Sequence, residues 1–238
     1  MKIALVCIAK NEDYYLDEWL EYNYKLGFDH IILYENNWRC SIDKPYLTKI
    51  PFDGEIKQLS AYNSFVENNV YYDWVSFIDC DEFITLKKHK NIKDFIEEYN
   101  NPFGISLNWY LFGSGDKKIR ENNSLLNQFK HRNSKVDDHI KVIMNLKSKF
   151  CMILPHNPNI PVFDTNGKLF FGPFNENGPT DVAYINHYRN KTYEDFNLRC
   201  KRGRADCEFV NDISEWESEM LDNIDTLDVT ALNFMYEN

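Results

Sequence analysis

The amino-acid sequence predicts an α/β fold, in which helices flank a mostly parallel sheet and a more irregular half follows. Strand-like and helix-like segments alternate through about the first 100 residues, which is typical of sheets with crossover helices. The strand-like segments are continuous apolar runs, as expected of strands covered on both faces. Polar residues cluster where these runs end, and this edge of the sheet is where ligands bind in such folds.

The first half supplies most of the regular elements. The apolar run from Ile3 to Ala9 predicts a buried strand. Asp13 to Leu26 has apolar residues at helical spacing, and Gly27 is a typical helix stop. Further strands are predicted at His30 to Tyr34, Gly54 to Leu59, Trp74 to Ile78 and Gly104 to Phe112, with a helix at Ile92 to Tyr99.

The second half is less regular. His139 to Leu154 predicts one or two strands, and Asn166-Gly167 predicts a hairpin turn between two short apolar pairs. A strand at Val182 to His187 and a basic helix from Thr192 to about Cys207 follow. An amphipathic helix is predicted for the acidic tail, with its apolar side formed by Ile213, Trp216, Met220, Ile224 and Leu227.

Composition indicates one ordinary globular domain. The chain has 238 residues, of which 43% are hydrophobic and 27% charged, which is enough for one sizeable core. No repeat or linker is evident. We therefore predict a single domain over residues 1–238, with one half at about 1–115 and a second half, including the helical tail, at about 116–238.

The charge distribution argues against nucleic-acid binding. The formal net charge is −10, and ten acidic residues lie between Ala205 and Asn238, where there is no Lys or Arg. The preceding body therefore has as many acidic as basic residues, and a net basic face of the kind that binds DNA or RNA is not expected. We predict no nucleic-acid partner.

The apolar segments and the cysteines indicate where in the cell the protein is located. No segment approaches the ~20 apolar residues that span a bilayer, so no transmembrane segment is expected. The short apolar run at the amino terminus fits a strand better than a signal peptide. Six scattered cysteines without a CxxC pair are expected to be reduced thiols. We predict a cytoplasmic protein, which would lie at a membrane surface only if the membrane holds a molecule that it binds.

Three polar clusters follow predicted strands: Lys10-Asn11-Glu12, Glu35-Asn36-Asn37 and Asp79-Cys80-Asp81. Asp79 and Asp81 form a DxD motif. On an extended strand, carboxylates two residues apart point to the same side and can share one divalent cation. Oxygen ligands of this kind suit Mg²⁺ or Mn²⁺, whose coordination shell substrate phosphates commonly complete. The alternative is a strand-end turn in which the aspartates cap backbone amides.

The order of these segments resembles that of GT-A (Rossmann-like) glycosyltransferases, and most of all the glycosyltransferase family 92 and family 2-like group. The resemblance covers roughly residues 3 to 204 and is carried by Val6 to Glu12, Leu16 to Leu20, Gly27 to Ile31, Leu33 to Asn37, Trp74 to Phe83, Asn108 to Gly115, Asn186 to Phe196 and Lys201 to Gly203. Glu35 departs from it, since this group often has Asp there.

The resemblance implies a metal-dependent hexosyltransferase that uses a nucleotide-diphosphate sugar donor and a glycan or other hydroxyl acceptor, with inversion. Residues 1–115 would then be the nucleotide-sugar half and the remainder the acceptor half. Mn²⁺ or Mg²⁺ would bind Asp79, Asp81 and His187, and Lys191 would contact the diphosphate. The nucleoside side would comprise Ala9, Lys10, Asn11, Glu12, Glu35 and Asn36, with Gln58, Ala61, Tyr62 and Asn63 in a loop near the base.

The general base stays open among several carboxylates. An inverting transferase needs one near the acceptor hydroxyl. The candidates are Asp116, Asp195 and Glu82, followed by Asp137 and Asp138. Asp195 has a structural alternative, because Thr192-x-x-Asp195 resembles a helix capping box. His131, His139 and His156 receive no role, and Trp109 and Phe112 are candidates for stacking on a sugar.

Two other functions compete with sugar transfer. Haloacid-dehalogenase-like phosphatases also place a DxD motif after a strand, although usually the first strand, whereas here it follows the fourth. A non-catalytic module that binds nucleotide sugars or glycans would retain the same fold. The residues leave the donor sugar, the nucleobase, the acceptor and the oligomeric state open.

Overall fold

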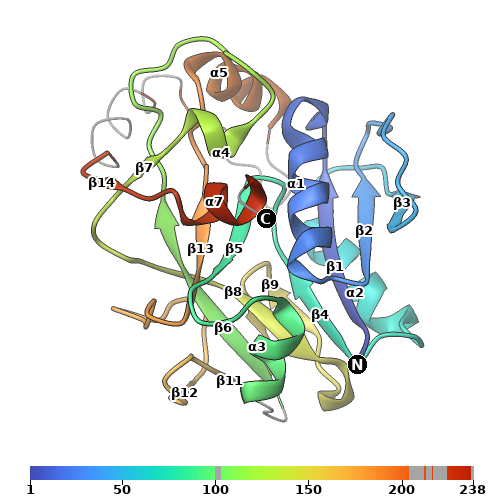
Figure 1. The fold of residues 1–238 in the computed structure, drawn as a ribbon. Coiled ribbons are helices and arrows are strands. Elements are labelled where there is room, and N and C mark those ends of the chain that lie inside the picture. The colour runs from blue at the N-terminus through green and yellow to red at the C-terminus, as the bar shows by residue number, and fades with distance from the viewer. Residues whose placement is uncertain (100–102, 204–211, 213–215, 217–223, 237–238) are drawn as a thin grey trace.

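The computed structural model describes residues 1–99, 103–203, 212, 216 and 224–236, and its centre is a twisted sheet (Figure 1). Neighbouring strands follow the order β12-β11-β6-β8-β4-β1-β2-β3, and β13 pairs with both β5 and β6. The strands of this sheet are β1 Ile3–Ala9, β2 His30–Glu35, β3 Leu47–Pro51, β4 Trp74–Phe77, β5 Glu82–Leu86, β6 Gly104–Leu111, β8 Asp137–Asn145, β11 Val162–Phe163, β12 Leu169–Phe170 and β13 Ala183–His187.

The remaining elements are short strands and helices around this sheet. The helices are α1 Asp13–Leu26, α2 Gln58–Asn68, α3 Ile92–Tyr99, α4 Leu125–Gln128, α5 Tyr193–Arg202 and α7 Thr230–Tyr236, with a 3₁₀ turn at Leu146–Ser148. The short strands are β7 His131–Arg132, β9 Met152–Leu154, β10 Asn157–Pro158 and β14 Thr226–Leu227.

The predicted α/β fold with a mostly parallel sheet is confirmed. Strands β3, β2, β1 and β4 are parallel neighbours, and β6 is parallel to both β11 and β13. Strand β8 is antiparallel to both of its neighbours, β4 and β6. The sheet therefore draws strands from both predicted halves of the chain.

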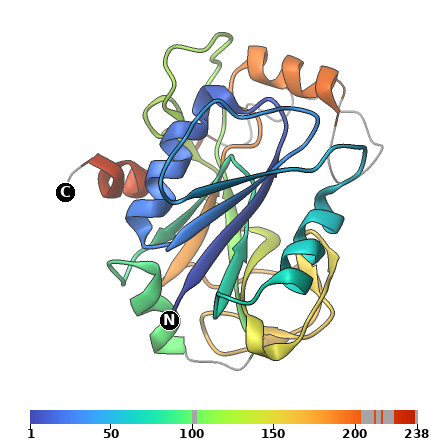
Figure 2. The ribbon, with the colours of Figure 1, turned by 90° about the vertical axis from the view of Figure 1, so that its right-hand side faces the viewer.

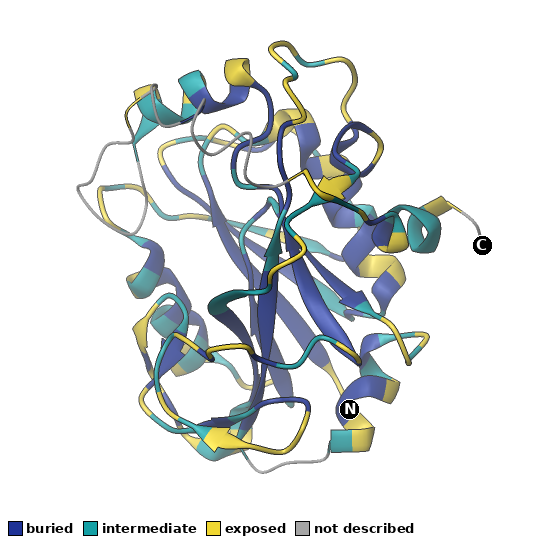
Figure 3. Ribbon diagram, turned by 90° about the vertical axis from the view of Figure 1, so that its left-hand side faces the viewer, coloured by how far each residue is buried: buried dark blue, intermediate teal, exposed yellow. Residues whose placement is uncertain are grey.

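Helices cover both faces of the sheet (Figure 2). Alternate residues of β1 enter different hydrophobic clusters, as the two-residue period of a strand requires. Leu5 and Cys7 pack in the cluster that holds Trp19 of α1. Val6 and Ile8 pack in the cluster that holds Tyr62 of α2. The central strands are consequently buried along their length (Figure 3), which explains their continuous apolar sequence.

Several predicted elements are confirmed at or near their boundaries. Strand β1 and helices α1 and α3 begin and end where the sequence predicts. Gly27 caps α1 in the left-handed region, with φ of 105°, which glycine adopts without a steric penalty. The hairpin around Asn166-Gly167 also forms, since β11 and β12 pair antiparallel on either side of it.

The predicted strand from Gly54 to Leu59 is wrong. The third strand is β3, and Gln58 already begins α2, so the residues predicted as a base-lining loop lie on a helix. Strand β3 lies at the sheet edge, pairs only with β2 among the described strands, and is partly exposed. Its sequence, Leu-Thr-Lys-Ile-Pro, therefore lacks the apolar run of a central strand.

The end of the chain allows only part of its prediction to be compared. The basic helix is confirmed as α5, which ends at Arg202, and residues from 204 toward Cys207 lie outside the described residues. The predicted acidic helix over Ile213 to Leu227 lies largely outside them as well. Within that stretch, Trp216 is described and buried, but Ile224 and Leu227 are exposed. The prediction is wrong at its carboxyl end, because Leu227 belongs to strand β14, which pairs with β7.

We expect Trp19→Phe to destabilise the fold without abolishing it. The Trp19 indole N–H donates to the Glu82 carbonyl at 2.9 Å inside the core, and phenylalanine has no donor to replace it. The free energy of unfolding, measured with urea, should fall by about 1–2 kcal/mol. Tyr71→Phe, at an exposed position, is the control. Equal stability of both variants and the wild type would contradict this role of Trp19.

Candidate functional site

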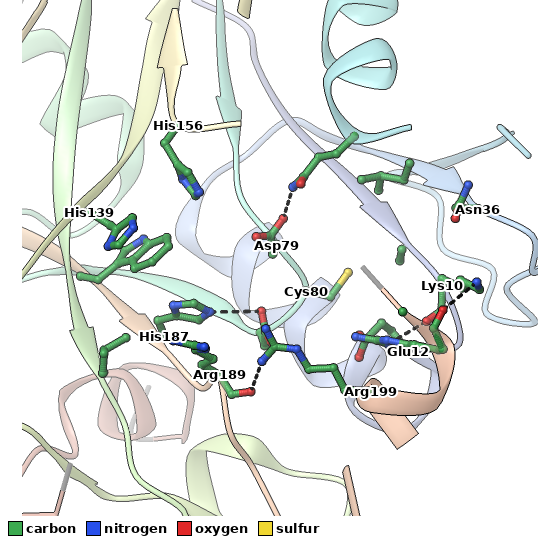
Figure 4. Close-up of a pocket in the computed structure, with 18 of the residues that line it drawn as sticks. Lys10, Glu12, Asn36, Asp79, Cys80, His139, His156, His187, Arg189 and Arg199 are labelled. Atoms are coloured by element: carbon green, nitrogen blue, oxygen red, sulfur yellow. Dashed lines mark hydrogen bonds and ion pairs between the residues drawn. The ribbon is translucent and has the colours of Figure 1, made fainter. Parts of the chain in front are cut away.

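A cavity of about 320 Å³ opens at the carboxyl edge of the sheet (Figure 4). Strands β1, β4, β6 and β13 end there, and antiparallel β8 begins there. The lining residues are Ile8, Ala9, Lys10, Glu12, Asn36, Gln58, Asp79, Cys80, Asp81, Trp109, Leu111, Asp137, His139, His156, His187, Arg189, Arg199, Arg202 and Gly203.

The order of the strands divides the cavity into three parts. Ala9, Lys10 and Asn36 line one end, which follows β1 and β2. The DxD turn after β4 lies in the middle, and Trp109 of β6 lines the other end with the first residues of β8. Figure 4 shows this sequence from Asn36 through Asp79 to His139.

Asp79 and Asp81 both line the cavity, but they do not lie on an extended strand as predicted. The Glu82 amide donates to the Asp79 carbonyl at 3.0 Å, which closes a turn between β4 and β5. The turn forms because β5 leaves the edge to pair with β13. The two aspartates reach the cavity through this turn.

Asp79 is held by three neighbouring side chains. Its Oδ1 accepts from Gln58 Nε2 at 2.7 Å and from the Tyr62 hydroxyl at 3.4 Å, and its Oδ2 accepts from Lys141 Nζ at 2.9 Å. Gln58 and Tyr62 come from α2, and Lys141 comes from β8. Asp79 therefore connects three elements at the centre of the cavity.

Lys141 is a buried ammonium between two carboxylates. Its side chain is 1% exposed, and its Nζ lies 2.9 Å from Asp79 and 3.4 Å from Glu82. Burial alone would lower the pKa of Lys141, but these carboxylates outweigh burial and raise the pKa above its ordinary value. Lys141 thus stays charged beneath the floor of the cavity.

Glu82 is fully buried and does not line the cavity. Burial raises the pKa of this carboxyl well above its ordinary value, and the neighbouring Lys141 opposes the rise. Its Oε2 accepts from the Asp79 amide at 3.0 Å, so the side chain supports the DxD turn. The structure places this predicted general base below the site and out of reach of an acceptor.

Asp81 faces one histidine and one lysine. Its Oδ1 lies 3.8 Å from His187 Nε2, and its Oδ2 lies 3.4 Å from Lys191 Nζ. Burial lowers the pKa of His187 well below its ordinary value, and Arg189 and Lys141 add to the effect. The imidazole is therefore neutral, which is the form that ligates metal ions.

The predicted nucleoside residues separate into two groups. Ala9, Lys10, Glu12 and Asn36 line the cavity. Glu35 is buried outside it, where Oε1 accepts from the Cys40 amide at 2.8 Å and supports the loop after β2. Asn11 turns away with φ of 56° and lines a second, smaller cavity of about 100 Å³.

Basic residues from the carboxyl-terminal part of the described chain close the site. Lys10 Nζ donates to the Arg202 carbonyl at 3.0 Å, and Arg202 Nη1 donates to the Lys10 carbonyl at 2.8 Å. Arg202 also forms an ion pair with Glu12. Lys191 lies 3.5 Å from Glu12 and lines the smaller cavity, so it bridges Glu12 and Asp81 from behind.

Two predicted base candidates lie away from the main cavity. Asp116 is exposed in the loop after β6 and does not line it. Asp195 forms the capping box with Thr192 and accepts from Tyr15 and Arg120 at 3.0 and 2.7 Å. The structural alternative for Asp195 is therefore confirmed, and its side chain lines only the smaller cavity.

No sequence pattern assigned a role to His139 and His156, which the structure brings into the cavity with Trp109 and Asp137. Their rings pack around Trp109, with centroid distances of 4.9 Å to His139 and 5.1 Å to His156. The available signal was the alternation of Asp137, His139 and Lys141 at the start of a strand. This alternation indicates cavity residues only when the antiparallel direction of β8 is known, because that direction places the start of the strand at the cavity.

Among the described residues, no group of three or more His, Cys, Asp or Glu side chains is arranged to hold a metal ion. Within the same part of the chain, every helix is too short or too polar to cross a bilayer.

Comparison with known proteins supplies the class of this protein. Residues 57–225, more than half of the chain, match the family model described as Glycosyltransferase family 92. The chain belongs to glycosyltransferase family 92, as its resemblance predicted. A family 92 protein from Ricinus communis is 23% identical over 133 residues, which are 50% of this chain and 24% of that protein. The chain thus matches about a quarter of that relative's length.

Solved structures of S. aureus TarS are also similar to this chain. TarS 1–349 aligns with 100% of this chain and 72% of its own, with 13% identity and a TM-score of 0.43. Its complex with UDP-GlcNAc aligns with 51% of this chain and 36% of its own, with 17% identity and a TM-score of 0.32.

We expect His156 to make the fold less stable in acid. Burial lowers the pKa of His156 to about 2, and the nearby Lys141 adds to this effect. Between this value and the ordinary pKa of about 6.5, the unfolded chain binds a proton that the folded chain does not, so stability rises with pH. The unfolding free energy of the wild type should fall between pH 6.5 and pH 5. In His156→Asn this fall should be smaller by about 2 kcal/mol.

Urea denaturation at several pH values measures this difference. Asparagine can still donate to the Ile140 carbonyl that His156 Nδ1 contacts at 3.1 Å. His131→Asn, at an exposed histidine of β7 outside the cavity, is the control. The same pH dependence in the His156 variant and the wild type would show that His156 does not titrate on unfolding.

Proposed function

We propose that this chain is a metal-dependent glycosyltransferase that moves a hexose from a nucleotide-diphosphate donor to a hydroxyl of a glycan or other acceptor, with inversion. One observation carries the proposal. A single cavity joins the polar ends of β1 and β2, the DxD turn with its surrounding arginines, and an aromatic end at β6 and β8. Membership of glycosyltransferase family 92 supports this use of the cavity.

The donor would occupy the cavity from the β1 end to the DxD turn. Ala9, Lys10, Glu12 and Asn36 would meet the nucleoside, since they line the end beyond β1 and β2. Arg189, Arg199 and Arg202 line the cavity beside Asp81, and guanidinium groups suit phosphate oxygens. A diphosphate bound there would lie next to the turn.

Asp81 and His187 fit a divalent cation by the chemistry of their donor atoms. Both side chains line the cavity, and the 3.8 Å between Asp81 Oδ1 and His187 Nε2 is a separation that one cation can bridge. A carboxylate with an imidazole favours Mn²⁺ over Mg²⁺. When bound, the cation would neutralise the charge that develops on the departing diphosphate.

Asp79 would act on this site through position. Its two oxygens already accept from Gln58 and Lys141, so it anchors the turn that presents Asp81. The same contacts weigh against a phosphatase, which would need this aspartate as a free nucleophile. Lys191, behind the turn, would hold Asp81 and add positive charge near the diphosphate.

The proposal includes a cytoplasmic location, with the protein at a membrane surface only where the acceptor is held by a membrane. Its support is the state of the cysteines. Cys7, Cys40, Cys80 and Cys151 are free thiols, as in proteins of reducing compartments.

We expect Asp81→Asn to weaken binding of UDP in the presence of Mn²⁺ by about tenfold or more, because the amide loses the charge that holds the cation. Isothermal titration calorimetry with UDP and GDP, with Mn²⁺ and with EDTA, measures the effect. Glu97→Gln, an exposed substitution on α3, is the matched control and should bind as the wild type does.

Three results would contradict the proposal. Nucleotide affinity that is the same with Mn²⁺, with EDTA and in Asp81→Asn would remove the metal from it. Release of inorganic phosphate from a phosphomonoester, without release of nucleoside diphosphate from a nucleotide sugar, would favour the phosphatase. Nucleotide binding without turnover on any acceptor or on water would favour a binding module.

A further inference from the structure

The cavity end at β6 and β8 holds a histidine that is hydrogen-bonded to a carboxylate. His139 Nδ1 lies 2.7 Å from Asp137 Oδ1, and the same oxygen accepts from the His139 amide at 2.9 Å. Both side chains line the cavity. A carboxylate on Nδ1 favours the tautomer with its proton there, which leaves the Nε2 lone pair for a ligand.

The ring of His139 is held between two aromatic side chains. It stacks on Trp109, with ring centroids 4.9 Å apart and an interplanar angle of 12°. Phe174 packs edge-on at 4.7 Å, and the backbones of His139 and Phe174 form an isolated antiparallel bridge. The side chain is nevertheless 42% exposed. The imidazole is thus oriented by its neighbours and still open to the cavity.

The other two histidines of the cavity have different surroundings. His156 Nδ1 contacts the Ile140 carbonyl, and the side chain is deeply enclosed. His187 lies beside Asp81 at the DxD turn. Of the three, His139 is the one with a carboxylate within hydrogen-bonding distance among the described residues.

The position of His139 suits the far side of a bound donor. Strand order places β1, β4 and β8 in succession, so the nucleoside residues, the DxD turn and His139 occupy successive parts of the cavity. An attacking hydroxyl must approach the sugar from the side opposite the departing diphosphate. The β8 end of the cavity provides that side.

We propose that His139 is the general base of the sugar transfer and that Asp137 is its positioning residue. The inference rests on the proposed function. His139 Nε2 takes the proton of the acceptor hydroxyl, and the acceptor oxygen bonds to the anomeric carbon of the donor sugar. The bond from that carbon to the diphosphate oxygen breaks, and the nucleoside diphosphate leaves with the electron pair. Asp137 keeps the Nδ1 proton in place and stabilises the imidazolium that forms.

This assignment replaces the three carboxylates that the sequence suggested. Glu82 is buried below the DxD turn, Asp195 caps α5, and Asp116 is exposed outside the cavity. Asp137 was a lesser candidate for the base itself. Its hydrogen bond to His139 gives it the role of orienting an imidazole, in the manner of a carboxylate–histidine pair.

The test uses release of UDP from UDP-GlcNAc, with water as the acceptor, in His139→Gln, Asp137→Asn and the wild type. If His139 is the base, His139→Gln should lower kcat by about 100-fold or more. Asp137→Asn should lower kcat by about tenfold or more with an unchanged KM for the donor. Imidazole in solution should restore part of the activity of His139→Gly.

His89→Gln is the matched control, because His89 also pairs with a carboxylate, Glu98 at 2.6 Å, but outside the cavity. Calorimetry with UDP separates a failure of the base assignment from a failure of the proposed function. Unchanged UDP affinity with a kcat within about threefold of the wild type in His139→Gln would overturn the base assignment. UDP binding by the wild type without turnover would overturn it too. If the wild type does not bind UDP, the proposed function is overturned instead.

Discussion

The buried ion cluster of Lys141, Asp79 and Glu82 is the constraint on which the rest of the site depends. An ammonium group with 1% exposure is tolerated because it lies 2.9 Å from the Asp79 carboxylate and 3.4 Å from Glu82, and both acidic side chains belong to the DxD turn. Glu82 also accepts a hydrogen bond from the Asp79 amide. Gln58 of α2 donates to Oδ1 of the Asp79 side chain. The turn that presents Asp81 to the cavity therefore has its conformation set from the protein interior.

The topology of the sheet explains why chemistry from distant parts of the chain meets at this turn. Strand β8 is inserted antiparallel between β4 and β6, so that its first residues lie beside the last residues of its neighbours. That reversal brings Asp137 and His139 to the edge where a parallel sheet collects strand ends. Strand β13 ends at the same edge with His187 and leads to the arginine-rich segment and α5, whose Arg202 is bonded to Lys10 at the end of β1.

The sequence predicted the parts of the fold whose signals are local. Continuous burial on both faces gives β1 its apolar run, and a left-handed glycine ends α1. The polar strand ends and the DxD motif likewise located the middle of the cavity. The edge strand β3 was missed because its burial, and hence its pattern, is partial. The shape of the DxD turn and the place of His139 depend on how β5 and β8 pair with strands far away in the sequence, which no local pattern contains.

The most direct measurement is a double-mutant cycle on the unfolding free energy of Lys141→Met, Glu82→Gln and the double variant. If the ion cluster sets the turn, Lys141→Met alone should cost about 3 kcal/mol, and the double variant should be more stable than the sum of the single losses by about 1 kcal/mol or more. UDP affinity should fall with Lys141→Met and recover in part in the double variant. Strictly additive losses, with UDP affinity unaffected throughout, would contradict the account.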